Sequence, residues 1–351
     1  MRSHRTCLRL TALLTVLCLT AAGCENRQAP VAPIEYNGLT MGTTYSVKLV
    51  DIPPGLDPQG LQEGIESRLA AVNARMSTYL ETSELSRFNN AGSTDWQSAS
   101  AELVKVLQNA LRISEISDGA FDVTVGPLVN LWGFGPGMTD DDIPSDAAIR
   151  EAQGKVGYRA LHVRSNPPAI KKDRGDLYVD LSAIAKGYAV DTVADYLDTA
   201  RLENYLVEVG GEIRARGHNA SGLAWRIGIE RPDPGTRAVH TVINLHDVAV
   251  ATSGDYRNYF EKAGHRYSHA LDPRTGRPVT HGLASVTVIS GTAMHADGMA
   301  TTLMILGPDA GYQLAEREAL AALFVVRIED HFVDRFTPAF ARYQAGREEH
   351  G

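Results

Sequence analysis

The sequence predicts an α+β protein, in which a single two-lobed domain is built on a mainly antiparallel sheet flanked by helices. Residues 204–290 form a succession of short β-rich runs, separated by turn signals such as Asp233-Pro234-Gly235. Helical periodicity occurs in blocks outside this stretch, and such segregation of strands and helices is typical of α+β proteins. No linker is visible after residue 36, so we expect one intertwined unit.

The first half of the body alternates predicted strands with helices. Residues 37–51 are rich in β-branched side chains. Apolar residues three or four apart, such as Leu61, Ile65 and Leu69, predict helices. In chain order we expect a strand or hairpin over 37–51, helices over 58–75 and 99–116, a loop over 133–145, a short helix capped by Ser145, a strand over Leu177–Leu181 and a helix over 183–198.

The second half is predicted to supply most of the sheet. The expected strands are 204–209, 212–216, 225–231, 239–245, 248–252, 267–271 and 284–290. Helices are expected at about 292–306 and 308–317, followed by a hairpin near 321–336.

The N-terminus has the features of an export signal. Residues 1–10 carry three arginines and no acid, and the apolar run that follows is shorter than the roughly 20 residues that span a bilayer. The run ends in Leu19-Thr20-Ala21-Ala22-Gly23-Cys24, which resembles a bacterial lipobox. We therefore expect a signal peptide over 1–23, lipidation of Cys24 and a tether over 24–36. A plain signal peptide, in which Cys24 is incidental, is the alternative.

These boundaries leave a body over 37–340 and a polar tail over 341–351. We expect the body to face the periplasm and to be anchored to a membrane of the cell envelope. Cys7, Cys18 and Cys24 are the only cysteines, so the body offers no thiol for catalysis or metal binding. The formal net charge of −8 becomes −11 when the three arginines of 1–23 are removed. Such an acidic chain is not expected to bind nucleic acid.

Two early segments could face a ligand. Gly42 in Met41-Gly42-Thr43-Thr44-Tyr45 would allow close backbone approach, and Met41 would give an adaptable apolar surface. An edge strand is the other interpretation. Tyr79 could stack on a planar ring, or it could be an ordinary core tyrosine.

Two further segments suit a flat, phosphorylated ligand. Residues 118–135 are dense in glycine and aromatics, as in a loop that folds over a ring, although such a loop could equally pack on the core. Residues 178–189 predict a strand that enters a helix, whose N-terminus attracts phosphate. Lys186 would add positive charge there, and Asp180 could accept from a ring N–H or a ribose hydroxyl. A packed strand–helix junction is the alternative.

The last segment indicates a cation site. Asp297 and Thr301 are four residues apart on a predicted helix and therefore share a face. A carboxylate, a hydroxyl and backbone carbonyls are oxygen ligands that suit Mg²⁺ better than zinc. A solvated helix face would show the same spacing.

Taken in order, these segments resemble the ApbE family of FAD:protein FMN transferases, from about Met41 to the strand near residue 327. The motifs that carry the resemblance are MGTTY, GAFDVTVGPLVNLWGFGP, DLSAIAKGYAVD, VGGEIRARG, TSGDYRNYF and SHALDPRTGRPV. The family's bacterial envelope members carry a similar signal peptide and lipobox.

The resemblance implies roles for particular residues. Mg²⁺ would be held by Asp297, Thr301 and the carbonyl of Ala183, with the carbonyl of Ala300 nearby. His269 corresponds to the family's candidate catalytic histidine. The residues implied to contact FAD are Met41, Tyr79, Ala120, Phe121, Asp122, Asp180, Lys186 and Leu271.

The implied reaction is a transfer of FMN from FAD to a threonine or serine hydroxyl of a target protein, with release of AMP. The implied targets are flavin-carrying subunits of Na⁺-translocating NADH:quinone oxidoreductase or Rnf-type complexes. Two other functions fit the residues: a FAD pyrophosphatase, which would use water in place of the hydroxyl, and a non-catalytic flavin-binding lipoprotein.

Overall fold

A computed structural model describes residues 33–135, 143–233, 238–255, 259–262 and 265–344. The predicted signal peptide 1–23, Cys24, most of the tether and the last residues of the tail lie outside these ranges. The folded body begins with a strand at Ile34, and the side chain of Tyr343 is still buried in a core. It therefore extends beyond residues 37 and 340 at both ends.

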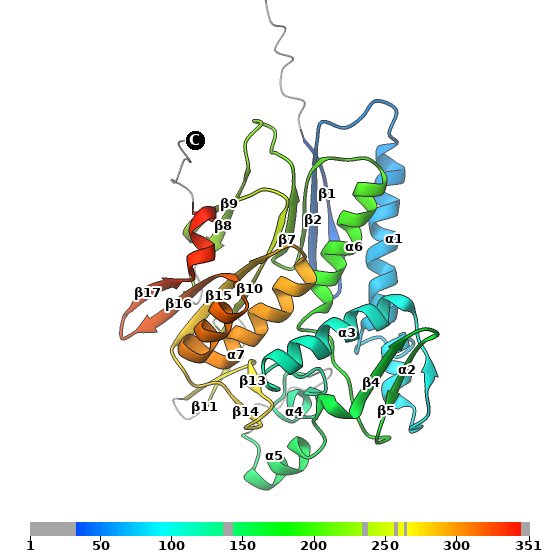
Figure 1. Cartoon of the computed structure of the whole chain (residues 1–351), viewed down its shortest axis with the longest axis vertical. Helices are drawn as coiled ribbons and strands as arrows, with labels where there is room; N and C mark the ends of the chain where they lie inside the picture. The colour runs from blue at the N-terminus through cyan, green and yellow to red at the C-terminus, as the bar shows by residue number, and fades with distance from the viewer. Residues whose placement is uncertain (1–32, 136–142, 234–237, 256–258, 263–264, 345–351) are drawn as a thin grey trace, which may run out of the picture.

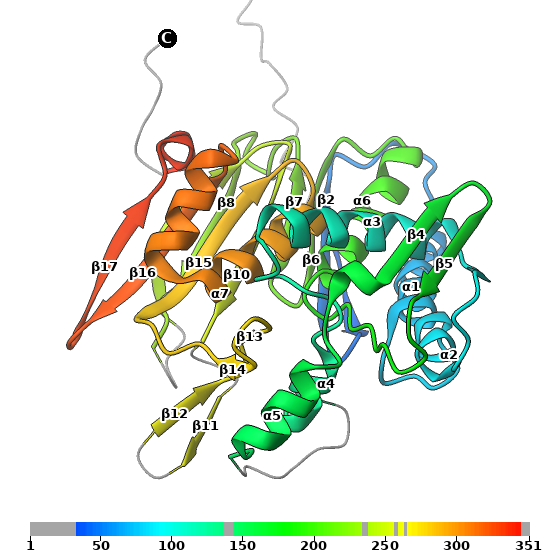
Figure 2. The ribbon, with the colours of Figure 1, turned by 60° about the horizontal axis from the view of Figure 1, so that its bottom comes forward.

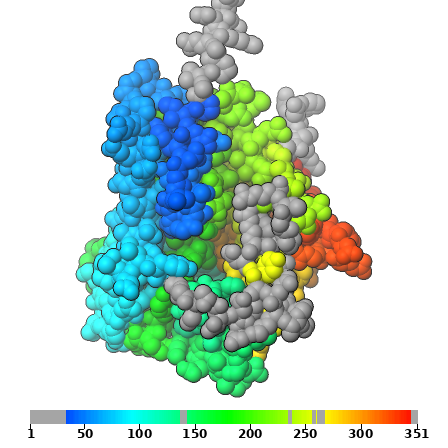
Figure 3. Space-filling view, turned by 180° about the vertical axis from the view of Figure 1, so that it is seen from behind, coloured from blue at the N-terminus to red at the C-terminus, as the bar shows by residue number. Residues whose placement is uncertain are grey.

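A single eight-stranded sheet organises the chain, and every neighbouring pair in it is antiparallel (Figure 1). The expected antiparallel α+β architecture is thus confirmed. In spatial order its strands are β1 (Ile34–Thr40), β2 (Thr43–Val50), β6 (Asn204–Val209), β7 (Glu212–Arg216), β10 (Val248–Gly254), β15 (Leu283–Ser290), β16 (Ala321–Ile328) and β17 (His331–Phe336). Seen from behind, the hairpin of β16 and β17 projects at one side of the molecule (Figure 3).

Helices cover one face of this sheet and form the main core with it. The helices on the sheet are α1 (Pro58–Met76), α6 (Ala185–Thr199) and α7 (Ala293–Arg317), and α3 (Ala101–Ile116) packs on α7 and contributes to the same core. Strand side chains alternate between two cores: on β16, Ala322 and Phe324 face the helices, whereas Leu323 and Val325 join a second core. Both faces of the sheet are therefore buried. Because side chains on both faces must be apolar, β15 and β16 are apolar along most of their length.

The second core is closed by a hairpin on the opposite face. The hairpin consists of β8 (Trp225–Glu230) and β9 (Val239–Leu245), and a 3₁₀ helix, η2 (Pro338–Tyr343), packs beside it. A third, smaller core lies below the sheet, where α4 and α5 pack beside the short strands β11 to β14 (Figure 2). Their bounds are α4 (Gly126–Leu131), α5 (Asp146–Gln153), β11 (Tyr259–Lys262), β12 (His265–Ser268), β13 (Leu271–Asp272) and β14 (Arg277–Pro278).

Most predicted elements are present, but the strand over Leu177–Leu181 is wrong. The backbone there has no strand partner, because the side chain of Asn89 takes that place. Asn89 Nδ2 donates to the carbonyl of Val179, and Val179 N–H donates to Asn89 Oδ1, both at 2.8 Å. The pairing residue comes from α2 (Glu84–Asn90), ninety residues earlier in the chain.

Several short elements are present beyond those expected. They are α2, α4, a 3₁₀ turn η1 (Tyr158–Ala160) and a small sheet of β3 (Gln97–Ser98), β5 (Pro168–Lys172) and β4 (Leu161–Ser165). The two helices expected over 292–306 and 308–317 are the halves of α7, which is interrupted at Gly307, where φ is 80°. Within the described ranges, every helix is too short or too polar to cross a membrane.

Candidate functional site

The site is organised by the contact between α6 and α7. The backbone N–H of Gly187 donates to Asp297 Oδ2 at 2.9 Å, and both residues are buried. The two helices approach so closely here that a Cβ atom on Gly187 would lie 2.3 Å from the carbonyl oxygen of Ala293. A glycine at this position is therefore what allows the carboxylate of Asp297 to reach the N-terminus of α6.

This contact frees a carbonyl at the same place. In a regular helix, the N–H of Gly187 would donate to the carbonyl of Ala183, four residues earlier. That N–H is used by Asp297 instead, and within the described ranges no backbone N–H donates to Ala183. The Ala183 carbonyl is thus left without its helical hydrogen bond, because the N–H that would donate to it is bound to the Asp297 carboxylate. This arrangement is compatible with the predicted metal site, which stays a prediction.

The other two predicted metal ligands follow on α7. Thr301 is one turn after Asp297 and half-buried, and Ala300 is 1% exposed. The described residues contain no group of three or more His, Cys, Asp or Glu side chains suited to a metal. A cation here would accordingly rely on one carboxylate, a hydroxyl and carbonyls, and such a hard-oxygen set fits Mg²⁺.

Lys186 lies between two carboxylates at the start of α6. Its Nζ is 2.8 Å from Glu212 Oε1 and 3.7 Å from Asp297 Oδ1, and both acidic side chains are almost completely buried. Burial alone lowers the pKa of Lys186, but the two carboxylates act in the opposite direction and together prevail, so the pKa is raised. Lys186 is therefore a cation in this site.

Glu212 is the residue that sequence reasoning missed. It begins β7, and its Oε2 is buried without a hydrogen-bond partner among the described residues. Burial raises its pKa, against the effect of Lys186. The only sequence signal was its place in VGGEIRARG, where an acid between glycines and an alternating strand looks like a surface residue.

Asp180 is held in a defined loop next to this centre. Its N–H donates to the carbonyl of Val123 at 2.7 Å, and its Oδ1 accepts from the N–H of Ser182 at 2.8 Å. The preceding Val179 is fixed by Asn89, as described above. The predicted strand–helix junction is thus a loop with a fixed backbone, in which Asp180 is half-buried.

A buried lysine, Lys172, also holds the loop that carries Asp180 in place. Lys172 is 0% exposed and donates to the carbonyls of Phe88, Asn89 and Leu177 at 3.0–3.3 Å. Burial lowers its pKa, with a smaller opposite effect from Asp176. These contacts join the end of α2 to the segment that carries Asp180.

The segment Ala120–Phe121–Asp122 is buried in the structure. The two oxygens of Asp122 accept from the N–H groups of Thr124 and Tyr158, and burial raises the pKa of Asp122 despite these bonds. Phe121 is 2% exposed and belongs to the main core. The side chains therefore serve packing, and a contact with FAD stays a prediction for the backbone of this segment.

Met41 lies at a turn and is partly buried against the main core, whereas Tyr79 is exposed. Met41 and Gly42 have φ values of 50° and 75° and form the two-residue turn between β1 and β2, so the hairpin rather than a single strand is the correct alternative for residues 37–51. Tyr79 is 69% exposed, which excludes the alternative that it is a core residue. A flat ring could be placed on it.

His269 lies on the short segment that joins β12 and β13, and Leu271 is the first residue of β13. The ring of His269 meets Phe134 edge-on, with 6.4 Å between the ring centroids. Leu271 is buried in the third core beside Trp132, whose indole N–H donates to the carbonyl of Gly276 at 2.9 Å. Residues 118–135 and 267–278 thus pack on each other, as the core-packing interpretation of the aromatic loop expects.

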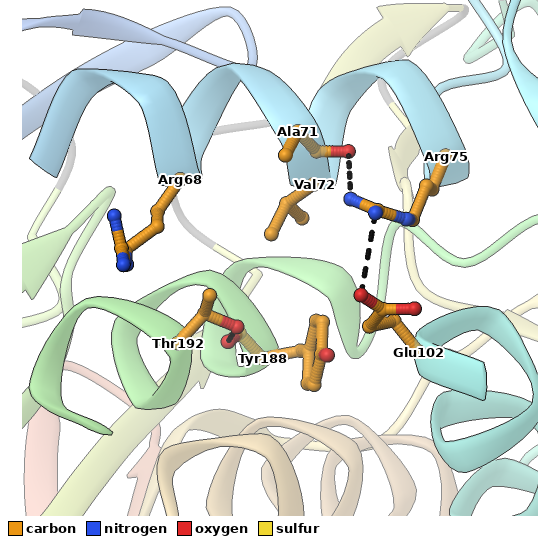
Figure 4. A pocket seen from close by; sticks show the side chains of 7 residues that line it. All are labelled: Arg68, Ala71, Val72, Arg75, Glu102, Tyr188 and Thr192. Atoms are coloured by element: carbon orange, nitrogen blue, oxygen red, sulfur yellow. Dashed lines mark hydrogen bonds and ion pairs between the residues drawn. The ribbon is translucent and has the colours of Figure 1, made fainter. Parts of the chain in front are cut away.

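A groove elsewhere on the molecule contains none of the predicted site residues. It has a volume of about 280 Å³ and lies between α1, α3 and α6. Figure 4 shows Arg68 and Arg75 of α1 on one side and Tyr188 and Thr192 of α6 on the other, with Arg75 paired to Glu102 at 3.2 Å. Its polar groups largely satisfy one another.

The comparisons with known proteins identify the family of this chain. A model of the ApbE family matches residues 41–324. A FAD:protein FMN transferase of Vibrio cholerae is 46% identical over 331 residues, which cover 94% of this chain and 97% of that protein. The solved structure of the flavin transferase ApbE from Vibrio cholerae superposes with a TM-score of 0.83 at 44% identity and covers 89% of this chain and 99% of that one.

A second solved structure, the apo form of the Pseudomonas stutzeri flavinyl transferase ApbE, gives a TM-score of 0.81 at 41% identity, over 88% of this chain and 95% of that one. Fold, length and sequence therefore agree across nearly the whole described body. The chain belongs to the ApbE family.

Proposed function

We propose that this protein transfers FMN from FAD to a threonine or serine hydroxyl of a target protein, depends on Mg²⁺ and releases AMP. The observation that carries the proposal is the bond from Gly187 to Asp297, because it joins a buried carboxylate to the start of α6 and leaves the Ala183 carbonyl without its helical hydrogen bond. A protein that only stored flavin would have no need for such a site.

Asp297, Thr301 and the Ala183 carbonyl would hold the Mg²⁺, with Ala300 next to them. When bound, the ion would supply positive charge for the pyrophosphate of FAD and for the departing phosphate. The protein adds Lys186, which stays protonated between its two carboxylates and carries charge toward the same phosphates.

The remaining predicted contacts would bind the nucleotide. Tyr79 offers an exposed ring for stacking, and Met41 lies in a turn that could close on an apolar surface. Asp180 has a fixed backbone and a half-buried carboxylate that could accept from a flavin N–H or a ribose hydroxyl. The Ala120–Asp122 segment and Leu271 would contribute through their backbone, since their side chains are buried.

In the reaction, the acceptor hydroxyl oxygen forms a bond to the phosphorus of the FMN half, and the bond from that phosphorus to the oxygen of AMP breaks. The hydroxyl proton passes to His269, and the leaving electron pair stays on AMP. A threonine hydroxyl is a poor nucleophile at neutral pH, so a base at this position is expected to matter.

We further propose that residues 1–23 are removed and that Cys24 is lipidated, which would anchor the enzyme in the cell envelope facing the periplasm. The acceptors would be flavin-carrying subunits of Na⁺-translocating NADH:quinone oxidoreductase or Rnf-type complexes. A body without cysteine suits an oxidising compartment.

The test is incubation of the protein with FAD, Mg²⁺ and an acceptor domain that contains the target threonine. Covalent flavin fluorescence on the acceptor, with one AMP released for each flavin attached, is the expected result. Free FMN and AMP without labelled acceptor would indicate a pyrophosphatase, and unchanged FAD would indicate a flavin-binding protein. An acceptor with Ala in place of the threonine and a D297N variant are the matched controls.

A further inference from the structure

A second contact between α6 and α7 lies one turn away from the first. Asp191 is on α6, four residues after Gly187, and is 4% exposed. Its two carboxylate oxygens accept from the N–H groups of Ala293 and Met294, each at 2.9 Å. These are the first two residues of α7, so a carboxylate from one helix caps the start of another.

The N-terminal cap of α7 needs Asp191 in addition to Thr292. The first four N–H groups of a helix have no partner inside that helix. In α7, the N–H groups of His295 and Ala296 are satisfied by the side chain and the carbonyl of Thr292, which leaves those of Ala293 and Met294 to Asp191. A negative charge at this end also interacts favourably with the helix dipole.

The two contacts form a clamp, which we define as the pairs Gly187–Asp297 and Asp191–Ala293. Each pair joins α6 to α7, and within each helix the two contact points are four residues apart. The helices run in opposite directions past each other at this point, so the clamp fixes both the distance between them and their relative position along the axes. One end of the clamp is the predicted metal ligand itself.

Arg214 completes the arrangement from the sheet. This β7 residue places Nη1 3.0 Å from Asp191 Oδ1, and the same nitrogen is 3.4 Å from Asp195. Two buried N–H donors and one guanidinium together hold the Asp191 carboxylate in place.

We propose that Asp191 is a positioning residue for the cation site, because it fixes the turn of α7 from which Asp297 reaches α6. The inference rests on the proposed function, in which Asp297 binds Mg²⁺. Residues that orient metal ligands contribute to metal affinity without touching the metal.

The chain contains a matched control for a merely structural role. Asp198 is on the same helix, seven residues further on, and pairs with Arg216 of the same strand β7, two residues after Arg214. It also accepts a hydrogen bond from Tyr205 at 2.8 Å. Asp198 therefore makes the same kind of helix-to-strand ion pair, but among the described residues it pairs with none in α7.

The experiment measures Mg²⁺ binding by calorimetry on the full protein in the absence of FAD, together with hydrogen exchange at the start of α7. D191N is expected to weaken Mg²⁺ binding by about tenfold or more and to speed exchange at Ala293 and Met294. D198N is expected to lower thermal stability but to leave Mg²⁺ affinity within about twofold of the wild type. The reason is that the contacts it weakens, those of Asp198 with Arg216 and Tyr205, are not part of the clamp.

A milder pair of variants covers the case in which D191N does not fold. R214Q removes the ion pair but leaves both hydrogen bonds to α7, and R216Q is its control. We expect R214Q to weaken Mg²⁺ binding by about threefold and R216Q to have no effect.

Equal Mg²⁺ affinity in D191N and wild type would overturn the positioning role alone, and so would equal losses in D191N and D198N. Absence of Mg²⁺ binding by the wild type would overturn the metal site of the proposed function and this inference with it.

Discussion

The ammonium of Lys186 lies 2.8 Å from Glu212 and only secondarily contacts the candidate metal ligand, Asp297, at 3.7 Å. A lysine that formed a close ion pair with Asp297 would compete with any cation for that carboxylate. We therefore expect Glu212, which is closer to the ammonium, to leave Asp297 more accessible to a cation.

The first prediction tests this competition. E212Q is expected to lower Mg²⁺ affinity about fivefold, because Lys186 can then move toward Asp297. In a K186M background, E212Q should lower Mg²⁺ affinity by less than about twofold, because no lysine is left to move toward Asp297. The measurement is a double-mutant cycle of Mg²⁺ binding without FAD. An undiminished fivefold loss in the K186M background would show that Glu212 acts directly on the cation site.

The second prediction concerns the close approach of the helices. G187A places a methyl group 2.3 Å from the carbonyl oxygen of Ala293 and 2.8 Å from Cβ of Asp297, so α6 and α7 must separate. We expect a loss of about 1–3 kcal/mol in the free energy of unfolding, measured by denaturant titration, and weaker Mg²⁺ binding. G291A is the control, because a Cβ on Gly291 meets nothing within 4 Å. Wild-type behaviour of G187A would contradict the description of this contact.

The third prediction separates catalysis from binding. H269A is expected to slow single-turnover flavin transfer about 10²-fold, as for loss of a general base. FAD affinity should change little, because the ring of His269 faces Phe134 and the proposed role concerns the acceptor hydroxyl. H218A, which alters a half-exposed histidine paired with Asp51, is the control. Transfer at the wild-type rate by H269A would remove this histidine from the mechanism.

The fourth prediction is a pH dependence of stability. Burial raises the pKa of Glu208 above its ordinary value of 4.5, although Gly211 N–H donates to its Oε1 at 2.7 Å. The folded state thus binds this proton more tightly than the unfolded state, and the carboxylate costs stability as pH rises through the raised pKa. E208Q keeps an acceptor for Gly211 but cannot ionise.

E208Q should therefore be more stable than wild type at pH 7, and the gain should vanish below about pH 4.5, where both chains are neutral at this position. Unfolding by urea at a series of pH values measures the difference. A gain that is constant with pH would show that the titration of Glu208 is not its cause.

Much of the fold follows from local sequence patterns. The stripe of Leu61, Ile65 and Leu69 predicted α1, and these residues are buried against the sheet. Ser145 caps α5 as expected, with its hydroxyl accepting from Ala148 N–H. Such signals depend on near neighbours in the chain, and they can be recognised without knowledge of the rest of the fold.

The details of the site depend on partners that are distant in sequence. The segment 177–181 resembles a strand, yet its partner is the side chain of Asn89. In the sequence, Glu212 resembles a surface residue. In the folded protein it is buried, because β7 packs against α6 and brings Glu212 to Lys186. Residue types and spacing therefore indicated candidate segments for the site, whereas the resemblance to a family was needed to propose roles for the residues within them.

The clamp between α6 and α7 has a consequence for how the chain becomes active. Its contacts join residues 110 and 102 positions apart, and the strands β6, β7, β10 and β15 of the central sheet all lie between the two helices in sequence. Neither helix alone, nor any fragment that ends before Asp297, contains all the residues of the proposed cation site. Pairing over such separations is slow to form. Activity is therefore expected to be acquired in one step late in folding, and cation binding would report that this step is complete.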